Sequence, residues 1–212
     1  MKKFIIFTLA LLTYLPSAYA QNMDESLFQL QKKWASVKYE IPEKQQKKPV
    51  IMLAKQAKKI SQQNTGKAEP LIWQAIIISM KAGLDGGKAG LREAKAAREL
   101  LLKAEKINPK ALNGAIYTSL GALYYKVPGW PIGFGDKKLA RKYLEKSLRM
   151  NPDGIDINYL YGEFLYQAGD YTKAKATLEH GLKVKPRIGQ EVADKGRKAE
   201  IKDLLQKVNK KL

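Results

Sequence analysis

Three segments of the chain repeat one spacing, and this repetition restricts the fold more than any other feature. An alanine is followed four residues later by a leucine and twelve residues later by a proline, in Ala97–Pro109, Ala140–Pro152 and Ala174–Pro186. Residues four apart lie on one face of a helix, and proline cannot continue a helix. The chain is therefore predicted to hold three helices in one register, each stopped at a proline.

A second pattern predicts partner helices before them. A glycine, Gly121 or Gly162, sits among large residues where two helix backbones are expected to approach closely. Gly169–Asp170 predicts a turn, since glycine accepts positive φ and aspartate caps the next helix. The matching positions are Tyr117, Leu120, Gly121 and Tyr124, then Asn158, Tyr161, Gly162 and Leu165, and, before Ala97, Trp73 and Ile76 with Ile77 in place of glycine.

These positions resemble the tetratricopeptide repeat, whose unit of about 34 residues pairs two antiparallel helices. The resemblance implies an all-α fold, an α-solenoid of about three to four helix hairpins with a C-terminal capping helix. Repeats are expected at about 70–110, 111–152 and 153–187. The family also implies a scaffold that binds a partner and carries out no catalysis.

The first twenty residues have the features of a secretory signal peptide. Lys2 and Lys3 precede the apolar run Phe4–Leu12, and Ala18–Ala20 forms a small-residue cleavage site. We expect cleavage after Ala20 and a periplasmic or secreted protein, which has no cysteine for disulfides. The apolar run is shorter than the roughly 20 residues of a membrane span, so the processed chain is not expected to be transmembrane.

The rest of the chain divides into three predicted parts: an N-terminal helical cap at 21–66, the repeats at 67–194 and a capping helix at 195–212. The apolar segment Pro70–Ala82 is predicted to be a helix packed between neighbours. Gly83–Gly90 is interpreted as a flexible turn, because it lacks the full pattern of a phosphate-binding loop. The last helix is expected from Gly196, after a loop.

An insertion interrupts the middle repeat. Gly121 and Ala140 are 19 residues apart, where Gly162 and Ala174 are 12 apart. The extra residues fall at 127–136, a segment rich in glycine and proline that also carries large apolar side chains. One interpretation is a compact loop with Trp130 and Phe134 tucked against its own helices and Asp136 capping the next helix. The other is a lip of the binding groove that offers aromatic surface to a partner. Both hold if one ring is buried and the other exposed.

The chain is strongly basic, with a formal charge of +19 that becomes +17 once Lys2 and Lys3 are removed. Such a charge favours an acidic protein or peptide partner and a weak association with anionic surfaces. Nucleic acid is not expected for an exported protein without a nucleic-acid motif.

No pattern for catalysis, for a metal or for a cofactor stands out. Asp153 and Asp156 are interpreted as residues of a helix N-terminus, and the single histidine, His180, as a surface residue. We therefore predict a protein that is not an enzyme and uses no cofactor.

The concave face of a helical solenoid is lined mainly by first helices, which gives a set of candidate binding residues. Tyrosine and tryptophan supply contact area, asparagine supplies hydrogen bonds, and arginine steers an acidic partner. The candidates are Asn113, Tyr117, Tyr124, Tyr125, Trp130, Phe134, Asn158, Tyr159, Tyr166 and Arg187.

Two readings of the function remain open. The glycine-rich insertion and the helix after it look similar to exported repeat proteins associated with tripartite periplasmic transporters, which would make the chain an accessory subunit of an envelope complex. The alternative is a small-ligand carrier with an apolar pocket under the loop that holds Trp130 and Phe134.

Overall fold

The computed structural model describes residues 17–212, with side chains from Met23 onward. Within this part, nine α-helices and two short 3₁₀ helices follow one another, and no strand is formed. The predicted signal peptide lies outside the described residues, apart from its last four, which begin the first helix. The α-helices are α1 (Ser17–Glu40), α2 (Lys47–Gln63), α3 (Ala68–Asp85), α4 (Gly87–Ile107), α5 (Ala115–Lys126), α6 (Lys137–Met150), α7 (Ile155–Gln167), α8 (Tyr171–Lys183) and α9 (Glu191–Asn209).

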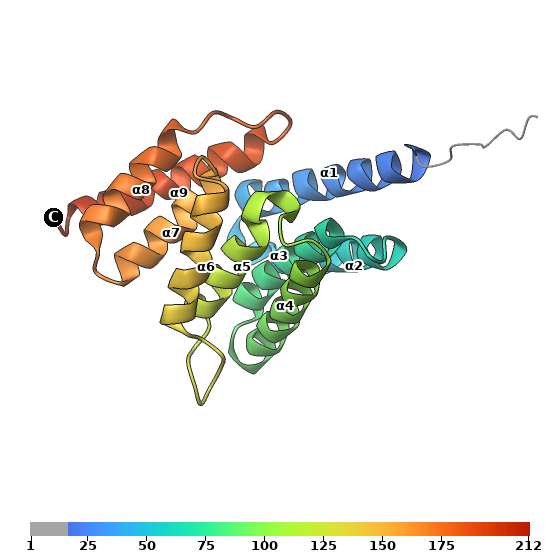
Figure 1. The fold of residues 1–212 in the computed structure, drawn as a ribbon, viewed down its shortest axis with the longest axis horizontal. Helices are drawn as coiled ribbons and strands as arrows, with labels where there is room; N and C mark the ends of the chain where they lie inside the picture. The colour runs from blue at the N-terminus through green and yellow to red at the C-terminus, as the bar shows by residue number, and fades with distance from the viewer. Residues whose placement is uncertain (1–16) are drawn as a thin grey trace, which may run out of the picture.

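The helices stack as consecutive hairpins, which confirms the predicted all-α solenoid (Figure 1). α1 packs on α2, α3 on α4, α5 on α6 and α7 on α8, while α9 covers the last hairpin. Ile201, Leu204 and Val208 of α9 are buried in one cluster with the α7/α8 pair, as predicted for a capping helix. The core therefore runs along the stack as a series of seams between neighbouring hairpins.

Two glycines set the spacing inside the middle hairpins. A Cβ built on Gly121 would lie 2.6 Å from Cγ of Leu144, and one built on Gly162 would lie 2.6 Å from Cγ of Leu178. Both leucines are fully buried. Each leucine of the repeated alanine–leucine pattern thus fills the space that the partner helix leaves open at its glycine, as the sequence predicts.

The α3/α4 hairpin differs from the predicted register. Ile77, expected at the glycine position, is buried against the N-terminal helices and lies in another cluster from Leu101 of α4. Ala75, two residues earlier, is the fully buried small residue that shares a cluster with Ala97 and Leu101. The sequence did not reveal that the small residue is Ala75 and not residue 77. Apolar residues occupy most sides of this helix, so their pattern does not show which side faces α4.

Several turns are shorter than predicted. α3 and α4 are separated by Gly86 alone, whose φ of 63° suits glycine, so most of the expected loop at 83–90 is helical. α9 begins at Glu191, five residues before the predicted start at Gly196. Asp136 and Asp170 cap α6 and α8 as predicted, since their carboxylates accept hydrogen bonds from backbone amides.

We expect alanine at either hairpin glycine to weaken the fold. Gly121→Ala and Gly162→Ala should each lower the free energy of unfolding by about 1–3 kcal/mol, because the added methyl group meets a buried leucine. Gly83→Ala is the matched control: nothing lies within 4 Å of its Cβ position, so it should be neutral or slightly stabilising. Urea unfolding followed by circular dichroism measures all three, and equal stability of the three variants would contradict the close approach.

Candidate functional site: a cleft closed by the terminal helices

The last helix of the chain returns to the first. A Cβ on Gly196 of α9 would collide with the Tyr39 ring of α1, so only glycine permits this approach. Nearby, the loop before α9 packs Gly189 on the ring of Phe28. The Gln190 side chain also donates a hydrogen bond to Gln31, 3.1 Å from nitrogen to oxygen. The two ends of the solenoid therefore meet, and the concave side becomes a cleft closed on one flank.

An ion-pair network holds α9 on α7, next to this junction. Arg197 is 7 % exposed and donates from Nε to Asp156 of α7 over 2.8 Å and from Nη1 to Glu200 over 2.5 Å. Arg187 binds Asp156 as well, with 3.1 Å from nitrogen to oxygen, and pairs with the buried Asp194 over 2.6 Å. The network joins α7, α9 and the loop between α8 and α9.

The charges of this network shift one another's pKa values. Burial alone would raise the pKa of Asp156, but the charges of Arg197 and Arg187 outweigh it and hold the pKa below its ordinary value. Burial and the charge of Arg197 lower the pKa of Lys38, which pairs with Glu200 over 3.2 Å, to about 8. Asp156 lies in the first turn of α7, as predicted, but its carboxylate makes no cap hydrogen bond. It binds two arginines and so fastens α7 to α9.

The cleft has a volume of about 1220 Å³. Its walls come from both ends of the chain and from the inner helices: α1 and α9 on the closing flank, and α3, α5 and α7 across the concave side. Both apolar and polar groups line it. They include Trp34, Trp73, Ile76, Leu112, Asn113, Ser119, Ile155, Leu160, Lys183, Lys185 and Arg187.

Charge in the cleft is unevenly paired. Lys32, Lys33, Lys183 and Lys185 line it, are exposed, and form no ion pair with a described residue. Its acidic groups are mostly engaged: Asp156 binds the two arginines, and Asp153 accepts a hydrogen bond from His180 at 2.8 Å. The cleft therefore presents unpaired positive charge.

Two tryptophans line the cleft edge to face, with ring centroids 5.7 Å apart. The indole N–H groups of Trp34 and Trp73 have no hydrogen-bond partner among the described residues. Their rings make this wall apolar, and Ile76 of α3 lines it with them.

Of the predicted binding residues, Asn113 and Arg187 line the cleft. Asn113 lies in the 3₁₀ turn Ala111–Gly114 at φ 49°, just before α5 and not inside it as predicted. Three candidates are placed in the core: Tyr117 is 1 % exposed, Tyr125 8 % and Asn158 2 %. Their periodic spacing was that of the hairpin seam, so these three side chains cannot reach a partner.

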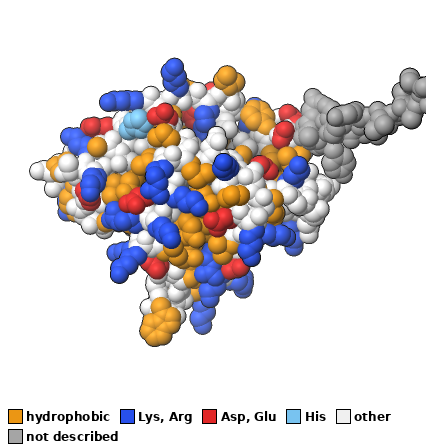
Figure 2. All heavy atoms as spheres, in the orientation of Figure 1, with side chains coloured by type: hydrophobic (Ala, Val, Ile, Leu, Met, Phe, Trp, Pro, Cys, Tyr) orange, Lys and Arg blue, Asp and Glu red, His pale blue; other side chains and the backbone are white. Residues whose placement is uncertain are grey.

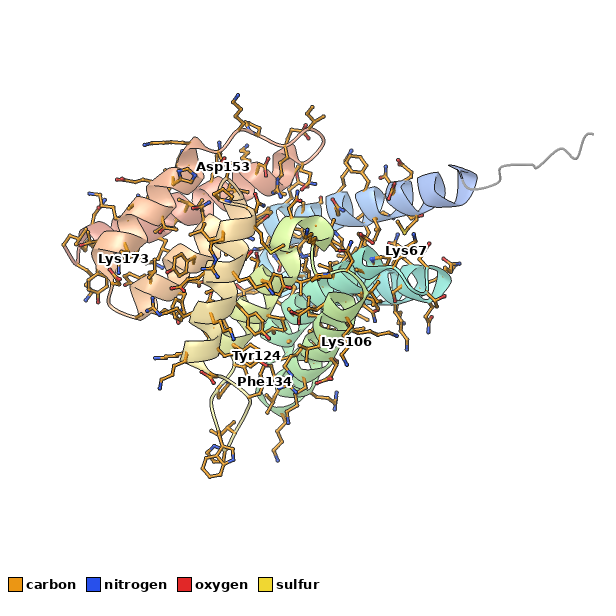
Figure 3. All side chains as sticks on the ribbon, in the orientation of Figure 1. Lys67, Lys106, Tyr124, Phe134, Asp153 and Lys173 are labelled. Atoms are coloured by element: carbon orange, nitrogen blue, oxygen red, sulfur yellow. The ribbon has the colours of Figure 1, made fainter. Side chains whose placement is uncertain are left out.

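The remaining tyrosines contact other groups of the protein. Tyr159 lies under the Arg197 guanidinium, 4.5 Å from ring centroid to carbon, and Tyr166 packs on Tyr171. Tyr124 packs edge to face on Phe134, with centroids 5.5 Å apart (Figure 3). The cleft is therefore not the tyrosine-lined groove that the sequence predicted.

The loop at 127–136 lies away from the cleft, since none of its residues lines it. Phe134 is packed at the base of the loop, while Trp130 is 90 % exposed at its tip. One ring is half-buried and the other exposed, but the loop forms no lip of the cleft, because the cleft is lined by other residues. An apolar pocket under this loop, expected for the carrier alternative, is not where the described cavity lies.

Sequence reasoning missed most of the cleft. Trp34 and Ile155 appear as ordinary core residues of amphipathic helices, and Lys183 and Lys185 as solubilising charge. The signals that could have pointed to them are Gly189 in the loop before α9 and Gly196 within that polar helix, because a glycine that no turn requires often marks a close approach.

Among residues 17–212, no cluster of His, Cys, Asp and Glu side chains could hold a metal ion, and no helix has the length and hydrophobicity to span a membrane. The fold defines an α-helical repeat scaffold. Residues 132–207, from the tip of the loop through α9, match the family model described as tetratricopeptide repeat. Repeats of this kind generally mediate protein–protein interaction. No curated protein matches the chain.

We expect the junction to depend on Asp156. Asp156→Asn should lower the free energy of unfolding by about 2 kcal/mol or more, because Arg197 stays buried with one carboxylate fewer to balance it. Asp153→Asn, on a side chain that is 79 % exposed, should change stability by less than about 0.5 kcal/mol. Thermal and urea unfolding measure both variants. If the two lose the same stability, the network does not hold α9 in place.

Proposed function

We propose that this protein is an exported, non-catalytic scaffold that holds a segment of a protein or peptide partner in the cleft between its terminal helices. The observation that carries the proposal is the cleft itself: about 1220 Å³, on the concave side of a helical repeat stack and closed by the contact of α9 with α1. The cleft places first-helix residues around one space, as repeat scaffolds do when they bind extended segments.

The size and lining of the cleft favour a peptide segment. Sites for drug-sized ligands occupy about 300–1,000 Å³ and are mostly apolar. This cleft is larger, and its mainly apolar walls, such as Trp73 and Leu160, also carry hydrogen-bonding groups, such as Asn113 and Ser119. A peptide needs both kinds of contact, because its backbone carries a donor and an acceptor at nearly every residue.

The charge of the cleft favours an acidic segment. Lys183 and Lys185 stand at the end of α8 and just beyond it, and neither is paired with a described carboxylate. Unpaired lysines at the rim attract an anionic partner over roughly a Debye length, and this attraction weakens as the salt concentration rises.

The exported location and the role in an envelope complex rest on the sequence. The basic, apolar and small-residue parts of residues 1–20 support export. The glycine-rich insertion supports a place among repeat proteins that accompany periplasmic transporters. A scaffold of this kind would act there as an accessory subunit that engages a partner through the cleft.

A small-ligand carrier is the second candidate, now with its site in the cleft. The contact between α1 and α9 favours a small ligand, because it closes one flank of the cleft and leaves a long peptide fewer ways to enter. Trp34 and Trp73 would then supply the apolar wall.

We expect a photoreactive amino acid in place of Leu112, on the cleft wall, to cross-link a protein in intact cell envelopes, whereas the same group at Gln206 on the outside of α9 should not. Lys183→Glu together with Lys185→Glu should reduce the yield at least about threefold, because the partner loses two attractive charges and meets two repulsive ones. Gel electrophoresis and mass spectrometry of the adduct give the readout.

Lys202→Glu with Lys207→Glu is the matched control, since it changes the net charge equally on exposed positions of α9. Equal losses from both pairs would mean that only overall charge matters. A bound small molecule in native mass spectra, with no protein adduct at Leu112, would support the carrier. No adduct and no bound molecule would refute both.

We further expect the protein recovered from cells to begin at Gln21 and to fractionate outside the cytoplasm. A signal peptidase needs small residues before its cut, so Ala20→Lys should leave the segment attached. Intact-mass measurement of both forms tests this. A full-length mass for the unchanged protein would rule out processing after Ala20.

A further inference from the structure

The loop between α5 and α6 is built as a stiff projection. Inside it, the amide of Gly135 donates to the carbonyl of Pro128 over 2.9 Å, and the amide of Gly133 donates to Gly129 over 3.0 Å. Its base is fixed by Phe134, which packs on Tyr124 of α5 and lies 4.4 Å from the guanidinium carbon of Arg98 on α4. Figure 1 shows the loop reaching beyond the helices at the lower edge of the molecule.

The tip of this projection is apolar and exposed. Trp130 is 90 % exposed and Ile132 is 68 % exposed, with the exposed Pro131 between them. Figure 2 shows hydrophobic side chains at the end of the projection, beyond the rest of the surface. The fold does not need them, because the equivalent connection between α7 and α8 is the short turn around Gly169 and Asp170. The apolar side chains of the tip are therefore available for contact with a surface or a molecule outside the chain.

Positive charge surrounds the base of the loop. Lys137, Lys138 and Lys142 follow it, are exposed, and form no ion pair with a described residue. On the neighbouring helix α4, Leu91 faces the loop close to Gly133, and Lys88 shares that side of the helix at a spacing of three residues.

The acidic groups in this region are already engaged. The carboxylate of Asp136 accepts hydrogen bonds from the amides of Lys138 and Leu139 as the cap of α6. Glu163 pairs with Lys126 over 2.8 Å, and Glu93 pairs with Lys81 over 2.9 Å. Exposed lysines without an ion-pair partner among the described residues therefore surround the base of the apolar tip. We call Lys88, Lys137, Lys138 and Lys142 the lysine collar.

We infer that this loop anchors the protein to the surface of an anionic lipid bilayer, with Trp130 and Ile132 in the interfacial layer and the lysine collar on the head groups. Tryptophan prefers this layer because its ring is apolar and its N–H can still reach a polar group. Basic side chains beside it are attracted to anionic lipids. A protein partner would need a pocket shaped to a convex tip, whereas a bilayer accepts the tip without one.

Vesicles with brominated acyl chains test the depth of Trp130 directly. Bromine quenches only indoles that enter the bilayer, and Trp34 and Trp73 are largely enclosed by the protein. The full chain is mixed with vesicles of phosphatidylcholine and phosphatidylglycerol in equal parts, and Trp130→Phe is measured in parallel. We expect the fluorescence that distinguishes the two proteins to be quenched and shifted to the blue. Unquenched Trp130 fluorescence would overturn the inference.

Vesicle co-sedimentation measures the contribution of each part. Trp130→Ala should weaken binding about tenfold, in line with one large apolar side chain returned to water. Ile132→Ser should weaken it less, and Ile188→Ser, on a residue 98 % exposed in another loop, should not. All variants have the same N-terminus, so any binding by residues 1–20, where they are still attached, is the same in each.

Lys137→Glu with Lys138→Glu tests the collar against Lys58→Glu with Lys59→Glu, exposed on α2 and equal in charge change. The first pair should weaken binding to the anionic vesicles, while the second should do so by less than half as much. Equal effects would mean attraction by overall charge, and equal binding of Trp130→Ala would point to a protein partner for the tip; either result refutes the anchor.

Discussion

The structure depends on the close approach of paired helices at single small residues. Where Gly121 and Gly162 leave no side chain, Leu144 and Leu178 of the partner helices fill the space and are completely buried. This contact fixes the distance and the rotation of each hairpin, since any larger residue would force the helices apart. Successive hairpins can then stack with the same offset, and the first helices line up on one side. The cleft follows from that alignment.

Closure of the cleft uses a different kind of contact. α9 meets α1 through Gly196 against the Tyr39 ring, and Lys38 of α1 pairs with Glu200 of α9. A network of buried or half-buried charges fastens α9 to α7 beside this contact. Arg197 carries its charge into the protein interior, which is tolerable only because carboxylates from α7 and α9 surround it. The chain thus combines apolar seams, which hold each hairpin, with an ionic network, which fastens α9 on α7.

The two proposed surfaces are separate and can act together. The cleft lies between the terminal helices, while the loop with Trp130 projects from the far end of the α5/α6 hairpin and lines no part of it. A protein anchored at the loop would present its cleft away from the lipid surface, where a partner can reach it. Basic charge serves both sites, although through different lysines.

The sequence by itself determined the hairpins, because their periodic leucines, small residues and prolines act locally. It predicted the caps at Asp136 and Asp170 and the position of the insertion at 127–136 for the same reason. Only the tertiary structure decided which face of each helix is inside: Tyr117, Tyr125 and Asn158 look like groove residues and are core residues. It also decided that Asp156 pairs with arginines far along the chain, and that the two ends meet. Contacts between distant residues depend on the accumulated turn of the whole stack, which no local pattern encodes.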